Sequence, residues 1–90
     1  MKLEEFANDK YKILNVIFDN EIQVNNDTYT NLNQQEIADI VKFSKKKVNI
    51  LLNELIDDGF IEKFNNLRGK YKLTNAGKKV VRLMDEIVKA

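Results

Sequence analysis

Apolar residues recur at helical spacing near the start of the chain, in the stretch LEEFANDKYKILNVIF. Placed on a helix, they fall along one side, which is typical of a helix that packs one face against a core. The pattern therefore predicts a helix over residues 3–18. Its apolar positions are Leu3, Phe6, Ala7, Ile13, Leu14, Ile17 and Phe18.

Two shorter amphipathic stretches follow in the middle of the chain. Asn33 is a suitable N-cap for a helix over residues 34–42. Ser44 is a suitable N-cap for a helix over residues 45–58, which we expect to end before Gly59. The residues expected to face the core are Ile37, Ala38, Ile40, Val41, Val48, Leu51, Leu52 and Leu55.

The remaining segments predict strands and a last helix. FIEKF and KYKL alternate enough to predict a two-stranded hairpin over residues 60–73, with Gly69 in its turn. Thr74 then caps a helix over residues 75–89. For residues 20–31 a small hairpin and an irregular loop fit equally well. The order of elements is that of a winged helix-turn-helix, a mainly α domain with a small β-wing.

Length and composition narrow the classes of protein. Ninety residues predict one domain, 1–90, with a small core. The chain has no cysteine and no histidine, so it lacks thiolate ligands and the commonest general base. We interpret the adjacent acids Asp57 and Asp58 as the solvent-exposed end of a helix and not as a catalytic pair. No apolar run is long enough to span a membrane and no signal peptide is evident. We expect a cytoplasmic protein that is not an enzyme and holds no metal or cofactor.

Charge is segregated along the chain, although the formal net charge is only +1. Residues 1–31 sum to −3 and residues 59–90 to +5, while Lys42 to Lys47 contains four lysines and no acid. Local positive charge of this kind is what a protein needs when one of its faces meets a polyanion. The chain has 13 Lys and 12 Asn. A general bias toward these two residues is the simpler explanation for the lysine cluster, and any functional interpretation has to be compared with it.

The stretch LNQQEIADIVKFSKKKVNILLNELIDDGFIEK resembles the helix-turn-helix of bacterial and archaeal winged-helix regulators of the MarR and PadR kind. The matching positions are Ala38, Ser44, Val48, the leucines Leu51, Leu52 and Leu55, and the run Gly59, Phe60 and Ile61. GKYKLTNAGKK also resembles the passage from wing to last helix in these regulators, so that the similarity covers about residues 32–80. The resemblance implies the winged helix-turn-helix fold. Lys42 departs from it, because such turns often use Gly to reach positive φ.

The three lysines that begin the helix over residues 45–58 stand where the helix dipole disfavours cations. The resemblance implies that this helix enters the major groove of double-stranded DNA, where phosphates would favour them. Asn is then the expected reader of adenine, and Ile50 either touches a thymine methyl or packs under the wing. The expected DNA-binding residues are Ser44, Lys45, Lys46, Lys47, Asn49, Ile50 and Asn53 in the helix region and Asn65, Asn66, Arg68 and Lys70 in the wing.

The last predicted helix carries a wide apolar arc with spacing like that of a coiled coil. We expect it to form a symmetric homodimer, since a core this small cannot cover both this arc and that of the first helix. The alternative, to which we give equal weight, is that this apolar arc packs against the rest of the same chain. The expected interface residues are Ala76, Val80, Leu83, Met84, Ile87 and Val88.

The leading hypothesis is a small dimeric regulator of transcription, most simply a repressor, that binds double-stranded DNA in a sequence-specific manner. A winged helix that serves as a protein-interaction module in a larger assembly is the alternative from another class. DNA binding in plasmid or phage replication or partition is a third possibility, which the residues do not distinguish from transcription.

Overall fold

The computed structural model describes residues 3–64 and 70–89. Within them four helices and four strands follow one another as α1 (Leu3–Asp19), β1 (Glu21–Val24), β2 (Asp27–Thr30), α2 (Gln34–Val41), α3 (Lys45–Asp57), β3 (Ile61–Lys63), β4 (Tyr71–Leu73) and α4 (Asn75–Lys89). The four predicted helices are confirmed to within one residue at each end. None of the helices in these ranges is both long and apolar enough to cross a membrane.

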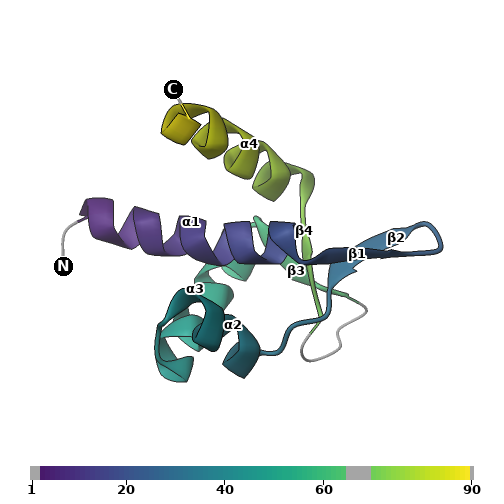
Figure 1. The fold of residues 1–90 in the computed structure, drawn as a ribbon, viewed down its shortest axis with the longest axis horizontal. Coiled ribbons are helices and arrows are strands. Elements are labelled where there is room, and N and C mark those ends of the chain that lie inside the picture. Colours follow the sequence, from purple (N-terminus) through teal and green to yellow (C-terminus); the bar gives the residue numbers. More distant parts are fainter. Residues whose placement is uncertain (1–2, 65–69, 90) are drawn as a thin grey trace.

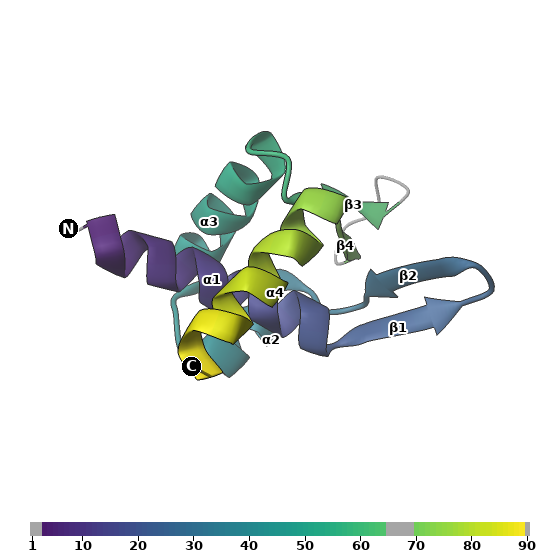
Figure 2. The ribbon, with the colours of Figure 1, turned by 90° about the horizontal axis from the view of Figure 1, so that it is seen from above.

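The helices lie in three levels, with α1 in the middle (Figure 1). The α2–α3 pair lies on one side of α1, and α4 crosses its other side obliquely (Figure 2). The core fills the space between these levels, and its largest share comes from α1 and α3. Its fully buried apolar members are Ile13, Leu14, Ile17, Ile37, Ala38, Val48, Leu51, Leu52, Leu55, Ile61, Tyr71, Leu73 and Val81.

The sheet is larger than the predicted wing. Residues 20–31, for which two interpretations were open, form the hairpin β1–β2, with Asn25 at a φ of 58° in its turn. Strand β2 then pairs with β4 through Thr30 and Tyr71, giving a four-stranded antiparallel sheet in the order β1-β2-β4-β3. The buried Thr30 hydroxyl donates to the Ile17 carbonyl, which anchors the hairpin to α1. The wing is thereby held on one side by a second hairpin.

One apolar position was predicted on the wrong side of its helix, and a second buried position was missed. Ile40 was expected to face the core, but half of its surface is exposed (50%). Val81 was left out of the arc on the last helix, yet it is fully buried in the core, with Val80 packed against that core beside it. Both errors have the same cause. An apolar arc that is wider than the contact surface does not show which of its edges turns inward.

Candidate nucleic-acid interface

The amino end of α2 is fixed by reciprocal hydrogen bonds. The Glu36 amide donates to Asn33 Oδ1 at 2.8 Å, and the Asn33 amide donates to Glu36 Oε1 at 3.2 Å. This capping box satisfies backbone groups that the first turn of a helix leaves unpaired. It confirms Asn33 as the N-cap. The side chains of Gln34 and Gln35 therefore leave the helix from a well-defined first turn.

The turn between α2 and α3 uses a strained residue. Lys42 has a φ of 65°, in the left-handed region, and its amide donates to the Ala38 carbonyl at 2.8 Å. Glycine usually supplies this conformation at a helix end. The turn is therefore of the usual kind, and Lys42 adopts it with backbone strain. Ser44 then caps α3, since its Oγ accepts from the Lys47 amide at 3.1 Å.

Helix α3 has a buried side and an exposed side, as predicted. Its leucines and Val48 are buried, while Lys46, Asn49, Ile50 and Asn53 are exposed. Ile50 keeps 47% of its surface exposed, so it does not pack under the wing. The helix ends at Gly59, which has a φ of 84° and donates to the Ile56 carbonyl, as in a Schellman motif.

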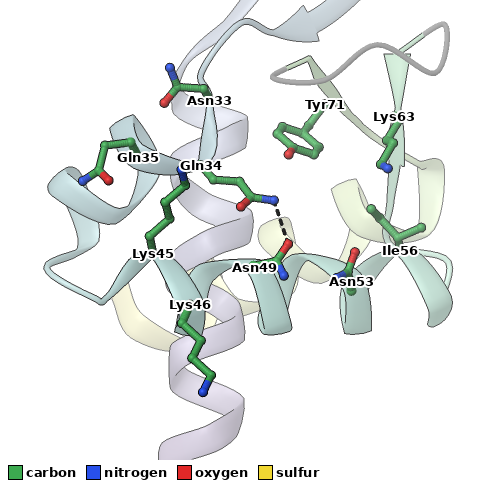
Figure 3. A pocket seen from close by; sticks show the side chains of 10 residues that line it. All are labelled: Asn33, Gln34, Gln35, Lys45, Lys46, Asn49, Asn53, Ile56, Lys63 and Tyr71. Carbon is green, nitrogen blue, oxygen red and sulfur yellow. Dashed lines mark hydrogen bonds between the residues drawn. The ribbon is translucent and has the colours of Figure 1, made fainter.

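A groove of about 830 Å³ runs along the exposed side of α3, between α2 and the strands β3 and β4 (Figure 3). Five amide side chains and three lysines line it, and none of its described lining residues is acidic. The groove therefore presents three ammonium groups together with the hydrogen-bond donors and acceptors of five side-chain amides. The lining residues are Asn33, Gln34, Gln35, Lys45, Lys46, Asn49, Asn53, Ile56, Lys63 and Tyr71.

Two hydrogen bonds between side chains order the amides of this groove. Gln34 Nε2 donates to Asn49 Oδ1 at 2.9 Å, which links the start of α2 to α3 (Figure 3). Gln35 Nε2 donates to Asp39 Oδ1, also at 2.9 Å, and so stays within its own helix. The two neighbouring glutamines therefore differ, because only the first is bonded to a residue on the exposed side of α3.

Lys47 does not lie with the other two lysines, contrary to the expectation that all three face one partner. Its Nζ is 2.8 Å from Asp9 Oδ2 on α1 and 4.2 Å from the centroid of the Phe43 ring. Successive helical residues point about 100° apart, so three adjacent lysines cannot share one face. Lys45 and Lys46 line the groove, whereas Lys47 turns toward α1.

The acids of α3 lie toward its carboxyl end, beside α1. Lys10 Nζ is 3.6 Å from Glu54 Oε2 and 3.3 Å from Asp58 Oδ2. Together with Asp9 and Lys47, these ion pairs place opposite charges of α1 against the two ends of α3. The amino end of α3 consequently keeps two lysines for the groove, while its acids lie at the other end and are not among the groove residues.

Of the four wing residues expected to contact DNA, the structure describes Lys70. Asn65, Asn66 and Arg68 lie outside the described residues. Lys70 is half-buried and its Nζ is 5.5 Å from the centroid of the Tyr29 ring. That ring stacks on Phe64 with 4.3 Å between centroids, so aromatic side chains join the two hairpins.

Helix α4 divides its apolar residues between the core and the exterior. Val81 is buried and Met84 is half-buried, whereas Leu83 and Ile87 keep 60% and 68% of their surfaces exposed. We name the outward set the α4 stripe. The side chain of Val88 lies outside the described part of the structure. Val80 is half-buried and packs against the core, so the α4 stripe consists of the exposed Ala76, Leu83 and Ile87.

The start of α4 is held close to the end of α3. Thr74 Oγ1 donates to the Gly59 carbonyl at 2.6 Å and accepts from the Gly77 amide at 3.1 Å, which confirms Thr74 as a cap. A Cβ at Gly77 would overlap the carbonyl group of Phe60, so only glycine permits this approach. The α4 stripe is therefore presented on a firmly anchored helix.

Two ionisable groups with shifted pKa values lie away from the groove. The hydrogen bond that Tyr11 donates to Asp85, at 2.6 Å, raises the pKa of the Tyr11 phenol and ties α1 to α4. Burial raises the pKa of the Glu21 carboxyl, and the ammonium groups of Lys78 and Lys72 oppose this rise only in part. Neither group lines the groove, and no group of His, Cys, Asp or Glu in the described residues could hold a metal ion.

Several groove residues were not predicted from the sequence. Gln34 and Gln35 come from α2, and Lys63 and Tyr71 come from the strands of the wing. The basic run that begins at Lys63 was a usable signal for that residue. The glutamines gave none, because their place in the groove depends on how α2 crosses α3.

Comparison with known proteins agrees with this fold. No known protein family matches the chain, and no curated protein matches it in sequence. Among solved structures it is similar to the CO-sensing protein from R. rubrum in its reduced, Fe(II) form, with a TM-score of 0.72 and 24% sequence identity. The match covers 82% of this chain and 35% of that protein. The chain therefore has the winged helix-turn-helix fold, on a length that is a minor part of the matched protein.

Proposed function

We propose that the chain binds double-stranded DNA, with α3 in the major groove. The observation that carries the proposal is the groove itself, where three lysines and five amides meet without a described acid. Lysines supply the sequence-independent attraction to phosphate, and amides suit the donors and acceptors of base edges. An exposed α3 of 13 residues is also long enough to lie across a major groove.

The lysines would act first, by contacting phosphates. Lys45 and Lys46 leave the amino end of α3, and Lys63 approaches from β3 on the other side of the groove (Figure 3). Cations on two walls suit a duplex whose phosphates flank the inserted helix. These contacts would set the position of α3 on the duplex.

Base recognition falls to the residues farther along α3. Asn49 and Asn53 are the proposed readers of base edges, and the exposed Ile50 is suited to a thymine methyl group. In the wing we keep Lys70 and the tip residues Asn65, Asn66 and Arg68 as proposed contacts to the adjacent backbone or minor groove. Lys47 is removed from the set, because Asp9 already pairs with its ammonium group. Ser44 is proposed to contribute indirectly, by capping the amino end of α3.

We further propose that two copies associate through the α4 stripe and act as a regulator of transcription, most simply a repressor. The exposed Leu83 and Ile87 support this, because adjacent large apolar side chains on one helix face are removed from water when copies pair. Two copies would present two α3 helices, as a DNA site with two halves requires. The same exposed pair also favours the second candidate, a protein-interaction module that binds another chain.

Binding to random-sequence duplex DNA as a function of salt tests the proposal. The three groove lysines of one copy, each neutralising a phosphate, predict a contribution of about −2.7 to the slope of log affinity against log salt. Selection of bound sequences from a random library then tests specificity. Light scattering gives the mass in solution. A chain that binds no duplex at low salt, yet captures a different protein through α4, would be the interaction module.

A further inference from the structure

The hydrogen bond between Gln34 and Asn49 joins two residues of the groove that come from different helices. Gln34 is the first residue of α2, and Asn49 lies on the exposed side of α3. We infer that Gln34 is a positioning residue, which holds the Asn49 amide in the orientation that reads adenine. The inference rests on the proposed DNA binding, and it names the base and the residue that sets the specificity.

The direction of the hydrogen bond decides what Asn49 presents. Gln34 Nε2 donates to Asn49 Oδ1, so the Asn49 amide is turned with its oxygen toward α2. Asn49 Nδ2 makes no hydrogen bond with the described residues and keeps both of its N–H donors. An amide oxygen has two lone pairs, of which Gln34 occupies one. Asn49 therefore offers a free donor and a remaining acceptor side by side.

Adenine matches this pair of groups better than the other bases do. Its major-groove edge carries the N7 acceptor beside the N6 amino donor. Asn49 Nδ2 can donate to N7 while the second lone pair of Oδ1 accepts from N6. Guanine presents two acceptors, N7 and O6, so its O6 would face the Asn49 oxygen. Turning the amide over would only move the repulsion from O6 to N7, and it would lose the match to adenine, so the orientation held by Gln34 matters for binding adenine.

The position of Gln34 is itself well determined. The capping box of Asn33 and Glu36 fixes the turn of α2 from which Gln34 projects, and the Gln34 side chain is half-buried. Ordering an amide before DNA arrives lowers the entropy lost on binding. It also fixes which end of Asn49 meets the base. Gln34 need not touch DNA to exert this effect.

Gln35 is a matched control within the same groove. It has the same side chain and lies one residue further along α2, but its Nε2 donates to Asp39 and not to α3. Loss of its amide should leave Asn49 undisturbed. A change in base preference on loss of Gln34 but not of Gln35 therefore reports on orientation and not on the number of amides in the groove.

The test selects duplexes from a random library with the full chain and the variants Gln34→Ala, Gln34→Met, Asn49→Ala, Gln35→Ala and the double variant Gln34→Ala/Asn49→Ala. Thermal unfolding first verifies that each variant folds. Affinities are then measured for the selected site and for the same site with its adenine replaced by guanine. The expected wild-type preference for adenine is on the order of tenfold to a hundredfold.

Asn49→Ala should abolish this preference. Gln34→Ala and Gln34→Met should lower it about tenfold at the same base, with the salt dependence unchanged. The double variant should be no worse than Asn49→Ala, because a positioning residue has no effect once the residue it positions is gone. Gln35→Ala removes another amide of the groove and is expected to lower the affinity for both duplexes alike, so the ratio of the affinities for adenine and guanine at this base should stay as in the wild type.

The outcomes separate this inference from the proposed function. A wild-type chain that binds no duplex overturns both. A wild-type chain that selects a sequence, but whose Gln34 variants retain the full adenine preference, overturns the inference and leaves DNA binding intact. Independent, additive losses in the double variant overturn it as well, since they would mean that Gln34 reads a base of its own.

Discussion

The groove along α3 and the α4 stripe are two exposed surfaces of the protein, and their chemistry is opposite. The groove gathers lysines and amides from α2, α3 and the wing, whereas the stripe exposes Leu83 and Ile87 on a single helix. A polar groove with cations loses little by facing water and gains when an anion arrives. Exposed apolar side chains gain only when another surface covers them. The comparison indicates two different partners.

The largest expected effect tests the apolar side of this comparison. The double substitution Leu83→Glu/Ile87→Glu should convert a dimer to a monomer, because two carboxylates cannot be buried at a symmetric contact. Affinity for a duplex with two half-sites should then fall by on the order of 100-fold or more, since each copy binds alone. Light scattering measures the mass, and fluorescence anisotropy measures DNA affinity.

Ile40→Glu is the matched control for this change, because Ile40 is also a half-exposed isoleucine on a helix but lies on α2. It should leave the mass unaltered. If the wild-type chain is already a monomer, or the double variant keeps the wild-type mass, the α4 stripe is not the contact between copies.

The next largest effect tests the polar side. Lys45→Ala/Lys46→Ala should lower DNA affinity at least tenfold near 0.1 M salt and reduce the salt slope by about 1.8, since two phosphates lose their partners. The free energy of unfolding should stay the same or rise slightly, because two cations leave the amino end of a helix. Binding titrations over a range of salt measure the slope.

Lys78→Ala/Lys79→Ala is the control for total charge. It also removes two adjacent lysines near the start of a helix, but these belong to α4 and do not line the groove. An equal loss of slope in both double variants would mean that lysine acts through the overall charge of the chain and that the groove has no special role.

A third prediction concerns the turn that sets the angle between the walls of the groove. Lys42→Gly should stabilise the fold by about 1 kcal/mol relative to Lys42→Ala, because both variants lose the charge but only alanine keeps a Cβ at positive φ. Chemical denaturation measures the difference. Equal stability of the two variants would show that the φ of 65° carries no strain.

Much of the fold could be predicted from local signals. Asn33, Ser44 and Thr74 were each identified as caps from residue type and from the apolar run that follows, and each makes the predicted hydrogen bond. The β1–β2 hairpin could not be settled in this way. Its alternation is too short, and its partner strand β4 lies far along the chain at Tyr71. Pairing between distant segments is set by the tertiary structure.

Part of the groove lining was predictable in the same way. The exposed side of α3 follows from helical periodicity, which correctly placed Lys46, Asn49 and Asn53. The opposite wall of the groove did not follow, because Gln34 reaches Asn49 only after α2 has crossed α3. The ion pair of Lys47 did not follow either, since its partner Asp9 belongs to α1 and sequence spacing gives no sign of the contact.

Lys47 gives the smallest expected effect and the sharpest test of the comparison. Lys47→Ala should cost at most about 1 kcal/mol of stability, because it removes a half-exposed ion pair and a contact with the Phe43 ring. Its salt slope for DNA should change far less than that of Lys45→Ala. A double-mutant cycle with Asp9→Ala should show a coupling of a few tenths of a kcal/mol. If Lys47→Ala instead lowers the slope as much as Lys45→Ala does, its ammonium group must leave Asp9 when DNA binds. The Asp9→Ala variant would then bind DNA more tightly than the wild type, because its carboxylate would no longer compete with phosphate for the same lysine.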